Sequence, residues 1–163
     1  MIRDLRFELS FKNIAQLDKK LLFCKSNNIT NINIPCKGLI KKELLNEAIE
    51  YISTNYKELN VVCHYSLSHQ YSKNIENSYQ EFLNFIEKFK SYRTYQILLV
   101  SGSNRKKNFE VLNVLNNLKK ENNLNMKLGI SHNPYLFKYY NDGAERKRIE
   151  KKISSGFINS IWL

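Results

Sequence analysis

The stretch IENSYQEFLNFIEKFKSYRTYQILLVS (75–101) contains two different hydrophobic patterns in succession. In its first part apolar residues recur every three or four positions, which places them on one face of a helix: Ile75, Tyr79, Phe82, Ile86 and Phe89. The last part, YQILLVS (95–101), is a short and almost continuous apolar run, as expected for a buried strand. The stretch therefore predicts a helix that leads directly into a strand.

The same alternation extends in both directions along the chain. Short β-rich runs begin about every 30 residues, the length of one strand–helix unit, and they cover 6–10, 30–35, 60–66, 95–101, 126–131 and 157–163. Between them lie further helical stripes: Leu45, Ala48, Ile49 and Ile52 in one, Leu112, Leu115 and Leu118 in another. The pattern predicts a parallel sheet covered by helices, either an open doubly wound sheet or part of a (β/α)8 barrel. No Gly-x-Gly-x-x-Gly follows the first strand, so the dinucleotide-binding version of the open sheet is disfavoured.

Composition limits the class of protein. The 163 residues suffice for one domain, and no apolar run reaches the length of a membrane span or forms a signal peptide at the start of the chain. We expect a cytoplasmic protein with no membrane partner. The three cysteines show no zinc-binding spacing and are expected to be reduced and mostly buried. The net charge of +11 comes mainly from Lys in a chain rich in Lys, Asn and Ile, and no nucleic-acid partner is expected.

Ligand sites form at the carboxyl ends of the strands in either architecture. The residues at these positions are Glu8, Ser10, Pro35, His64, Ser66, Ser101, Gly102, Ser103, Ser131, His132, Asn133 and Leu163. Glu8 lies within an apolar run, where a carboxylate is costly unless it is paired or functional. It is therefore either the partner of an inward Lys or Arg, or a general acid.

The two histidines allow two interpretations. With Glu8, His64 and His132 could supply two nitrogens and an oxygen to a metal, but no pair of ligands comes from one element. We therefore favour hydrogen-bonded histidines and predict no metal site. The segment SGSN (101–104) exposes hydroxyls and backbone N–H groups after the fourth strand and suits a phosphate or ribityl contact.

The last helical segment has simpler explanations. Asp142 and Glu145 have the spacing of a capping box that opens this helix. The basic run RKRIEKK (146–152) is interpreted as a solvated helix face rather than as a nucleic-acid contact.

Several of these features occur together in one known family. Phe7-Glu8 in the first strand, Cys63-His64 in the third, the turn Ser-Gly-Ser, the fifth-strand GISHNP (129–134) and the ending E…RIEKKISSGFINSIWL together resemble the methylenetetrahydrofolate reductase family over nearly the whole chain. The resemblance implies a flavin-dependent (β/α)8 barrel in which NAD(P)H reduces FAD, which then passes hydride to a folate one-carbon unit. For this chain it implies a single, incomplete α/β barrel domain over 1–163, with about six parallel strands and five intervening helices.

The resemblance also assigns roles to residues. Glu8 matches the catalytic glutamate, and His64 matches a histidine beside the flavin. Glu145 matches an acidic FAD contact and Lys152 a lysine near the ribityl and phosphate groups. The remaining residues expected around the cofactor are Ser101, Gly102, Ser103, Ser131 and His132.

The chain departs from the family at several of these positions. Ser101 and Ser103 replace an arginine and an aspartate, Pro35 replaces a threonine, and Leu163 stands in place of a glutamine. Asn133-Pro134-Tyr135 replaces the Pro-Glu-x-x-His-Pro motif. These departures favour an alternative, a catalytically inactive barrel relative or fragment that at most binds a phosphate-containing ligand. Because a full barrel has eight strands, we further expect a C-terminally truncated member whose exposed sheet edges favour a homo-oligomer.

Overall fold

A computed structural model describes residues 6–36, 42–90, 96–101, 109–121, 128–132 and 142–163. Strands and helices alternate along the chain: β1 (Phe7–Glu8), α1 (Ile14–Ser26), β2 (Asn31–Ile34), α2 (Lys42–Asn55), β3 (Asn60–Ser66), α3 (Ile75–Lys90), β4 (Gln96–Val100), α4 (Val111–Glu121), β5 (Leu128–Ser131), α5 (Asp142–Ile153) and β6 (Ile158–Trp162). Within these described ranges there are six strands and five helices, the numbers that the repeat predicted.

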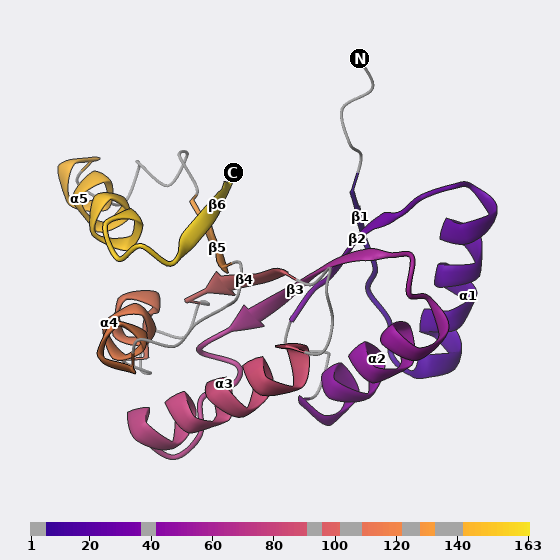
Figure 1. Ribbon diagram of the computed structural model, residues 1–163, viewed down its shortest axis with the longest axis horizontal. Helices are drawn as coiled ribbons and strands as arrows, with labels where there is room; N and C mark the ends of the chain where they lie inside the picture. Colours follow the sequence, from indigo (N-terminus) through magenta and orange to yellow (C-terminus); the bar gives the residue numbers. More distant parts are fainter. Residues whose placement is uncertain (1–5, 37–41, 91–95, 102–108, 122–127, 133–141) are drawn as a thin grey trace.

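The strands form one sheet in the order in which they occur in the chain. Each strand pairs in parallel with the next, from β1 to β6. A doubly wound sheet reverses direction at a switch point, whereas this sheet runs in one direction around a curve, so the (β/α) barrel alternative is correct. The sheet is not closed. Figure 1 shows the five helices around the outside of the curve and an open side between β1 and β6.

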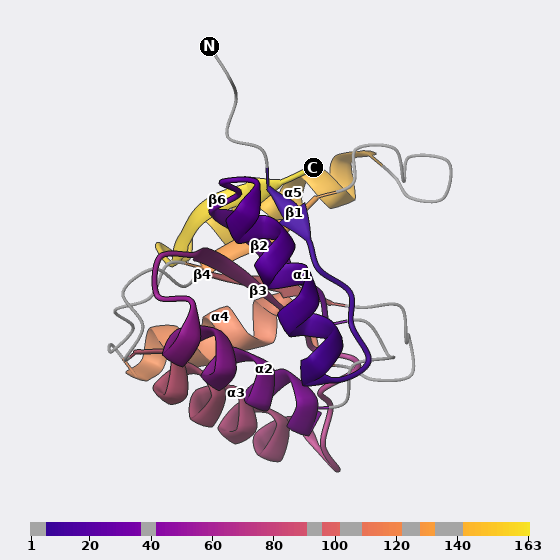
Figure 2. The ribbon, with the colours of Figure 1, turned by 90° about the vertical axis from the view of Figure 1, so that its right-hand side faces the viewer.

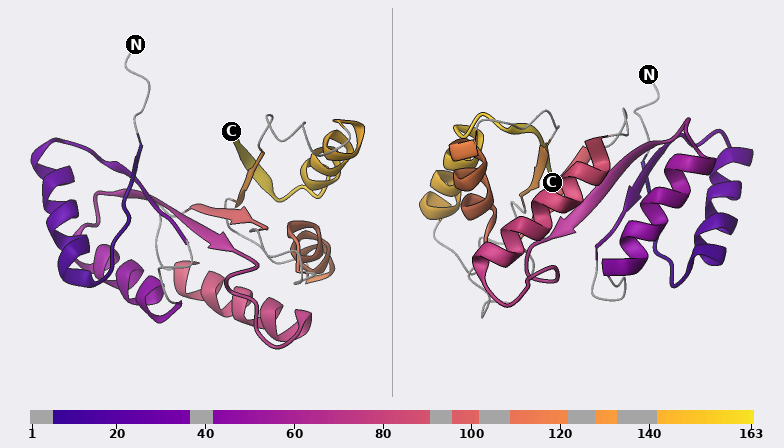
Figure 3. Two further views of the ribbon diagram at one scale, coloured as in Figure 1. Left: turned by 180° about the vertical axis from the view of Figure 1, so that it is seen from behind. Right: turned by 60° about the horizontal axis from the view of Figure 1, so that its bottom comes forward.

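The helix-facing side of the sheet contains the hydrophobic core. The buried strand residues of this side belong to one continuous cluster with the helices: Ile32, Ile34, Val61, Cys63, Tyr65, Ile97, Leu99, Leu128 and Ile130. Burial of each large apolar side chain contributes about 1.5–3 kcal/mol. The views in Figure 3 show the helices packed along this outer surface, with α2 beside α3.

The helices form where the apolar periodicity predicted them. In α3, Tyr79, Phe82, Ile86 and Phe89 are buried as expected, but Ile75 begins the helix and remains 37% exposed. In α4 the buried face consists of Val111, Val114, Leu115 and Leu118, and Leu112 is only half-buried.

Side-chain caps and one glycine fix several helix ends. Asn13 precedes α1 and its side chain accepts a hydrogen bond from Gln16 N at 2.9 Å. Asn74 does the same for α3, accepting from Asn77 N at 2.8 Å. These contacts satisfy backbone donors that a helix start leaves unpaired. At the other end of α5, Gly156 adopts φ +85°, a left-handed conformation that favours glycine, and turns the chain into β6.

The two edge strands approach each other through their side chains. The guanidinium of Arg6, just before β1, lies 5.8 Å from the ring centroid of Trp162 in β6. β1 and β6 overlap at the top of the view in Figure 2, and Figure 1 shows the gap between them, so the contact is made by side chains and not by strand pairing. The edge residues Phe7, Ile161 and Leu163 expose 40%, 44% and 93% of their surface. Association of copies through these edges stays a prediction.

Two composition-based expectations can be compared with the structure. All three cysteines are unpaired and buried, as expected. Across the described ranges, no helix combines the length and the apolar character needed to cross a lipid bilayer.

Candidate functional site on the concave face

The inner, concave face of the sheet is largely polar. Directly paired residues of neighbouring parallel strands share a face, and this pairing defines the set: Glu8, Asn31, Asn33, Asn60, Val62, His64, Ser66, Gln96, Leu98, Val100, Gly129, Ser131, Ser160 and Trp162. Val62 and Leu98 are buried but lie outside the main hydrophobic cluster, as expected for the opposite side of the sheet. Branched apolar residues dominate the interior of an ordinary (β/α)8 barrel, so this surface has a different composition.

Arg6 organises the amino-terminal end of the concave face. Its Nη1 donates hydrogen bonds to the carbonyl oxygens of Ile32 at 3.1 Å and Asn60 at 2.9 Å. Its Nη2 lies 3.4 Å from Oδ1 of Asn31, which also accepts from Asn60 Nδ2 at 2.9 Å. Together with its contact to Trp162, these bonds tie β1, β2, β3 and β6 together below the strand ends.

A second polar group lies between β4 and β6. Gln96 Nε2 donates a hydrogen bond to Ser160 Oγ, and Trp162 Nε1 donates to the same oxygen at 3.0 Å. Gly129 of β5 makes room for this group, because a Cβ there would lie 2.8 Å from Ser160 Oγ and 3.0 Å from Trp162 Nε1. These side chains and Arg6 form a floor, and the strand ends above it remain for a ligand.

Glu8 lies on the concave side of the edge strand β1 and is exposed. A burial cost for its carboxylate was expected from its apolar neighbours, but β1 has only two residues, both exposed. The carboxylate is therefore accessible to a ligand and to water.

His64 lies on the same face two strands away and is half-buried. Glu8 is level with Val62, so two strand spacings and a two-residue offset along the strand separate Glu8 and His64 by roughly 12 Å. At this distance they cannot exchange a proton directly, but both can contact one extended ligand.

Two neutral side chains of the concave face have unused hydrogen-bonding capacity. Asn33 is 9% exposed and Ser66 is 2% exposed. Within the described ranges, Asn33 Oδ1 and Ser66 Oγ find no hydrogen-bond partner. Unpaired buried polar atoms are uncommon in folded proteins. Asn33 Oδ1 can accept a hydrogen bond, and Ser66 Oγ can donate or accept one.

Ser101, Ser131 and His132 lie at the ends of β4 and β5. Ser101 and Ser131 are exposed, and Ser101 O accepts a backbone hydrogen bond from Ser68 N at 3.1 Å. His132 N donates to Trp162 O at 2.7 Å, which continues the pairing of β5 with β6. His132 Nδ1 is buried and finds no partner among the residues that the structure covers.

Glu8, His64 and His132 are not gathered into a metal site. In the described portion of the chain, no group of three His, Cys, Asp or Glu residues could hold a metal ion. This finding removes the metal-centred interpretation of the three residues.

Glu145 and Lys152 lie on α5, in the helix layer. Glu145 contacts Arg148 at 3.9 Å. Burial lowers the pKa of the Lys152 ammonium, and the negative charges of Glu145 and Glu110 oppose this shift. Lys152 therefore belongs to the helix layer, whereas Glu8 and His64 lie on strands of the concave face.

Some predicted positions lie outside the described residues. Gly102, Ser103 and Asn133 are among them, and so is the side chain of Asp142, although α5 does begin at that residue. The predicted phosphate or ribityl contact of the 101–104 turn therefore stays a prediction.

The sequence predictions did not include Asn33, Gln96, Ser160 and Trp162. These residues are uncharged, and the predictions considered only charged residues and residues at strand ends. A signal was available in NINI (31–34), where Asn and Ile alternate and so predict one polar and one apolar face.

Comparison with known proteins adds no assignment: no protein-family model matches the chain, and no curated protein does. A functional proposal for this chain therefore depends on the residues of the concave face and on the resemblance described above.

Proposed function

We propose that the concave face binds a flavin and that the chain is a divergent, methylenetetrahydrofolate reductase-like oxidoreductase. The observation that carries this proposal is the shared position of Glu8, Asn33 and His64 on one face of three adjacent strands. An exposed carboxylate, a half-buried imidazole and an unpartnered amide oxygen there lie within reach of one flat polar ligand.

The residues have separate tasks in this proposal. FAD would supply hydride transfer between NAD(P)H and the one-carbon unit of a folate. Glu8, at the open edge, delivers a proton to the folate and recovers it from water. His64 and Asn33 orient the ring system by hydrogen bonds to its polar edge, each worth about 1 kcal/mol. The half-buried polar floor below them keeps the ligand at the strand ends.

The test is a visible absorption spectrum of the purified protein after FAD is added and the excess is removed. The proposal predicts retained oxidised flavin. Glu8→Gln should then leave the spectrum intact and lower turnover of methylenetetrahydrofolate by at least about 100-fold, the usual minimum contribution of general acid catalysis. Glu47→Gln, an exposed change on α2, is the matched control and should change neither. A colourless protein would refute the flavin site, and full activity of Glu8→Gln would refute the role of Glu8.

A second candidate is a barrel relative without catalysis that binds a phosphate-containing ligand. The position of Lys152 favours it, because this lysine, matched to the ribityl and phosphate groups of FAD, lies on α5 in the helix layer rather than with Glu8 and His64. Titration with pyrophosphate, followed by calorimetry, separates the two candidates. Binding of pyrophosphate by a protein that retains no flavin would favour the second candidate, and flavin retention would favour the first.

A further inference from the structure

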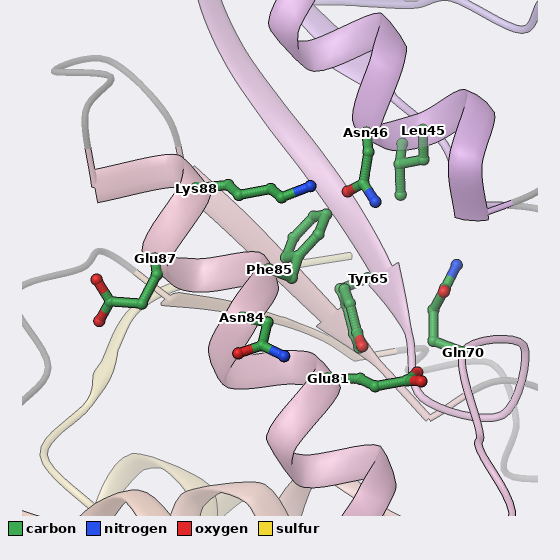
Figure 4. A pocket seen from close by; sticks show the side chains of 9 residues that line it. All are labelled: Leu45, Asn46, Tyr65, Gln70, Glu81, Asn84, Phe85, Glu87 and Lys88. Atoms are coloured by element: carbon green, nitrogen blue, oxygen red, sulfur yellow. The ribbon is translucent and has the colours of Figure 1, made fainter.

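A groove crosses the opposite, helix-covered side of the sheet between α2 and α3 (Figure 4). Its volume is about 470 Å³, within the usual range for small-molecule sites. The residues that line it are Leu45, Asn46, Tyr65, Gln70, Glu81, Asn84, Phe85, Glu87 and Lys88. None of the roles inferred for the concave face uses this groove.

Tyr65 supplies an unusual group at one end of the groove. The side chain is 1% exposed, and its ring packs against Phe82 and Phe85 at centroid distances of 5.1 and 4.7 Å. Its hydroxyl is buried and has no hydrogen-bond partner among the described residues. Burial raises the pKa of this phenol, with a further rise from the charge of Glu81, so the hydroxyl stays neutral at ordinary pH.

Two more oxygen acceptors lie beside this hydroxyl. Figure 4 shows the Glu81 side chain extending below the Tyr65 ring toward Gln70. Gln70 is 6% exposed, and its Nε2 donates to Cys36 Sγ at 3.1 Å, which leaves Oε1 as an acceptor. The Tyr65 hydroxyl, the Glu81 carboxylate and the Gln70 side chain therefore all lie at the end of the groove opposite Lys88.

The rest of the groove sets the shape of a ligand. Leu45 and Phe85 supply apolar surface next to the three oxygens. Lys88 lines the opposite end, so positive charge there disfavours a ligand that is cationic throughout. An alkylammonium group has three N–H donors, which suit the oxygen acceptors at this end of the groove, and aromatic rings nearby favour a cation.

We propose that this groove binds a linear primary amine, with its ammonium group held by Glu81, Tyr65 and Gln70 and its alkyl chain lying on Leu45 and Phe85. The site is separate from the concave face, so its occupancy does not depend on flavin binding.

The test is an NMR titration of the ¹⁵N-labelled protein with hexylamine and, as the charge-reversed control, hexanoate. Hexylamine should shift the side-chain amide signal of Gln70 and the backbone amides of Tyr65 and Phe85 in a saturable way, and hexanoate should not. Equal shifts with both compounds, or none with hexylamine, would overturn the proposal.

Variants define the contacts. Glu81→Gln should weaken hexylamine binding by at least about tenfold, because it removes a charged acceptor. Glu76→Gln, an exposed change on the same helix at a residue that does not line the groove, is the matched control, and it should leave the affinity unchanged. Tyr65→Phe keeps the ring packing and should weaken binding about fivefold. Equal losses in Glu81→Gln and Glu76→Gln would mean that the amine responds only to general surface charge, and they would overturn the proposal.

One more ligand identifies the source of the ammonium group. Nα-acetyl-lysine methylamide carries the same group on a peptide unit. Tighter binding of this compound than of hexylamine assigns the site to a lysine side chain of a peptide, and the reverse order assigns it to a free amine. Either order supports the ammonium site, and failure of both compounds to bind overturns it.

Discussion

The two faces of the sheet have opposite chemistry. Along β4, Ile97 and Leu99 face the helices in the continuous core, whereas Gln96 faces the concave side and bonds to Ser160. Along β2, Ile32 and Ile34 are completely buried, and the alternate residue Asn33 has an unpaired side-chain oxygen among the described residues. The helix-facing side is therefore apolar, and the concave side is mainly polar, with Val62, Leu98 and Val100 as apolar exceptions.

Because of this difference, we expect the helix-facing side to contribute most to stability and the concave side to contribute groups for binding. An ordinary barrel fills its interior with branched apolar residues, so both faces of its sheet contribute to the core. Here the helix layer provides most of the buried apolar surface, and the concave face contains groups that hydrogen-bond to each other or remain available. Substitutions on the two faces should therefore have different consequences, and three pairs of variants test this.

The largest difference is expected between neighbouring residues of β4. Ile97→Ala removes a fully buried side chain from the helix-facing core and should lower the free energy of unfolding by about 2–5 kcal/mol. Gln96→Ala removes one hydrogen bond from a half-buried side chain and should cost about 1 kcal/mol. Urea unfolding followed by circular dichroism measures both. Equal losses would mean that the concave face is as much a part of the core as the helix-facing side.

A smaller effect is expected from a methyl group added to the concave floor. Gly129→Ala would bring a Cβ within 2.8 Å of Ser160 Oγ, and the resulting overpacking should cost about 1–3 kcal/mol. In a Ser160→Ala background the nearest of these contacts is absent, so the same substitution should cost less. A double-mutant cycle measures this coupling. Additive losses would contradict the packing of Gly129 against Ser160.

The smallest effect is expected at a polar cluster of the helix layer in which two tyrosine hydroxyls donate hydrogen bonds to one carboxylate. Tyr51 lies in α2, and Tyr56 directly follows its last residue. The hydroxyls of both donate hydrogen bonds to the same oxygen of Asp18, at 2.7 and 2.6 Å. The hydrogen bonds from Tyr56 and then Tyr51 lower the pKa of the Asp18 carboxyl. The resulting stability is therefore complete above the unfolded-state pKa, about 3.9, and is lost as the pH falls through the lower folded-state pKa.

Asp18→Asn should accordingly reduce the urea midpoint more at pH 7 than at pH 3. Tyr56→Phe, which removes one of the two donors, should show the same pH dependence with a smaller amplitude. A loss of equal size at both pH values would show that the carboxylate charge does not contribute.

Much of the fold could be predicted from the sequence because periodicity reports burial. The run 60–66 matches β3 residue for residue, and the other strands lie within their predicted runs. Errors occurred at element ends and starts: Ile75 was expected in the core but begins a helix, where packing neighbours are fewer. Periodicity could not predict the strand order, because open doubly wound sheets and barrels have the same local pattern. The observed order, from β1 to β6 in sequence, distinguishes the barrel from the doubly wound sheet.

The candidate site was less predictable. His64 and Glu8 could be selected as polar residues in apolar strands, and the structure has them on one face. The predicted burial cost of Glu8 was wrong, because an edge strand of two residues leaves its side chain in solvent. The groove beside Tyr65 could not be found from sequence, since strand periodicity predicts a buried ring but not whether its hydroxyl finds a partner.

The most direct test of the contrast between the two faces is an NMR titration of the ¹⁵N-labelled protein with FAD. If the concave face is the ligand surface, the amide signals of Glu8, Asn33 and His64 should shift together and saturate, while those of α2 and α3 around the groove stay in place. Shifts confined to the helix layer, or no saturable shift at all, would contradict the assignment of the concave face as a flavin site.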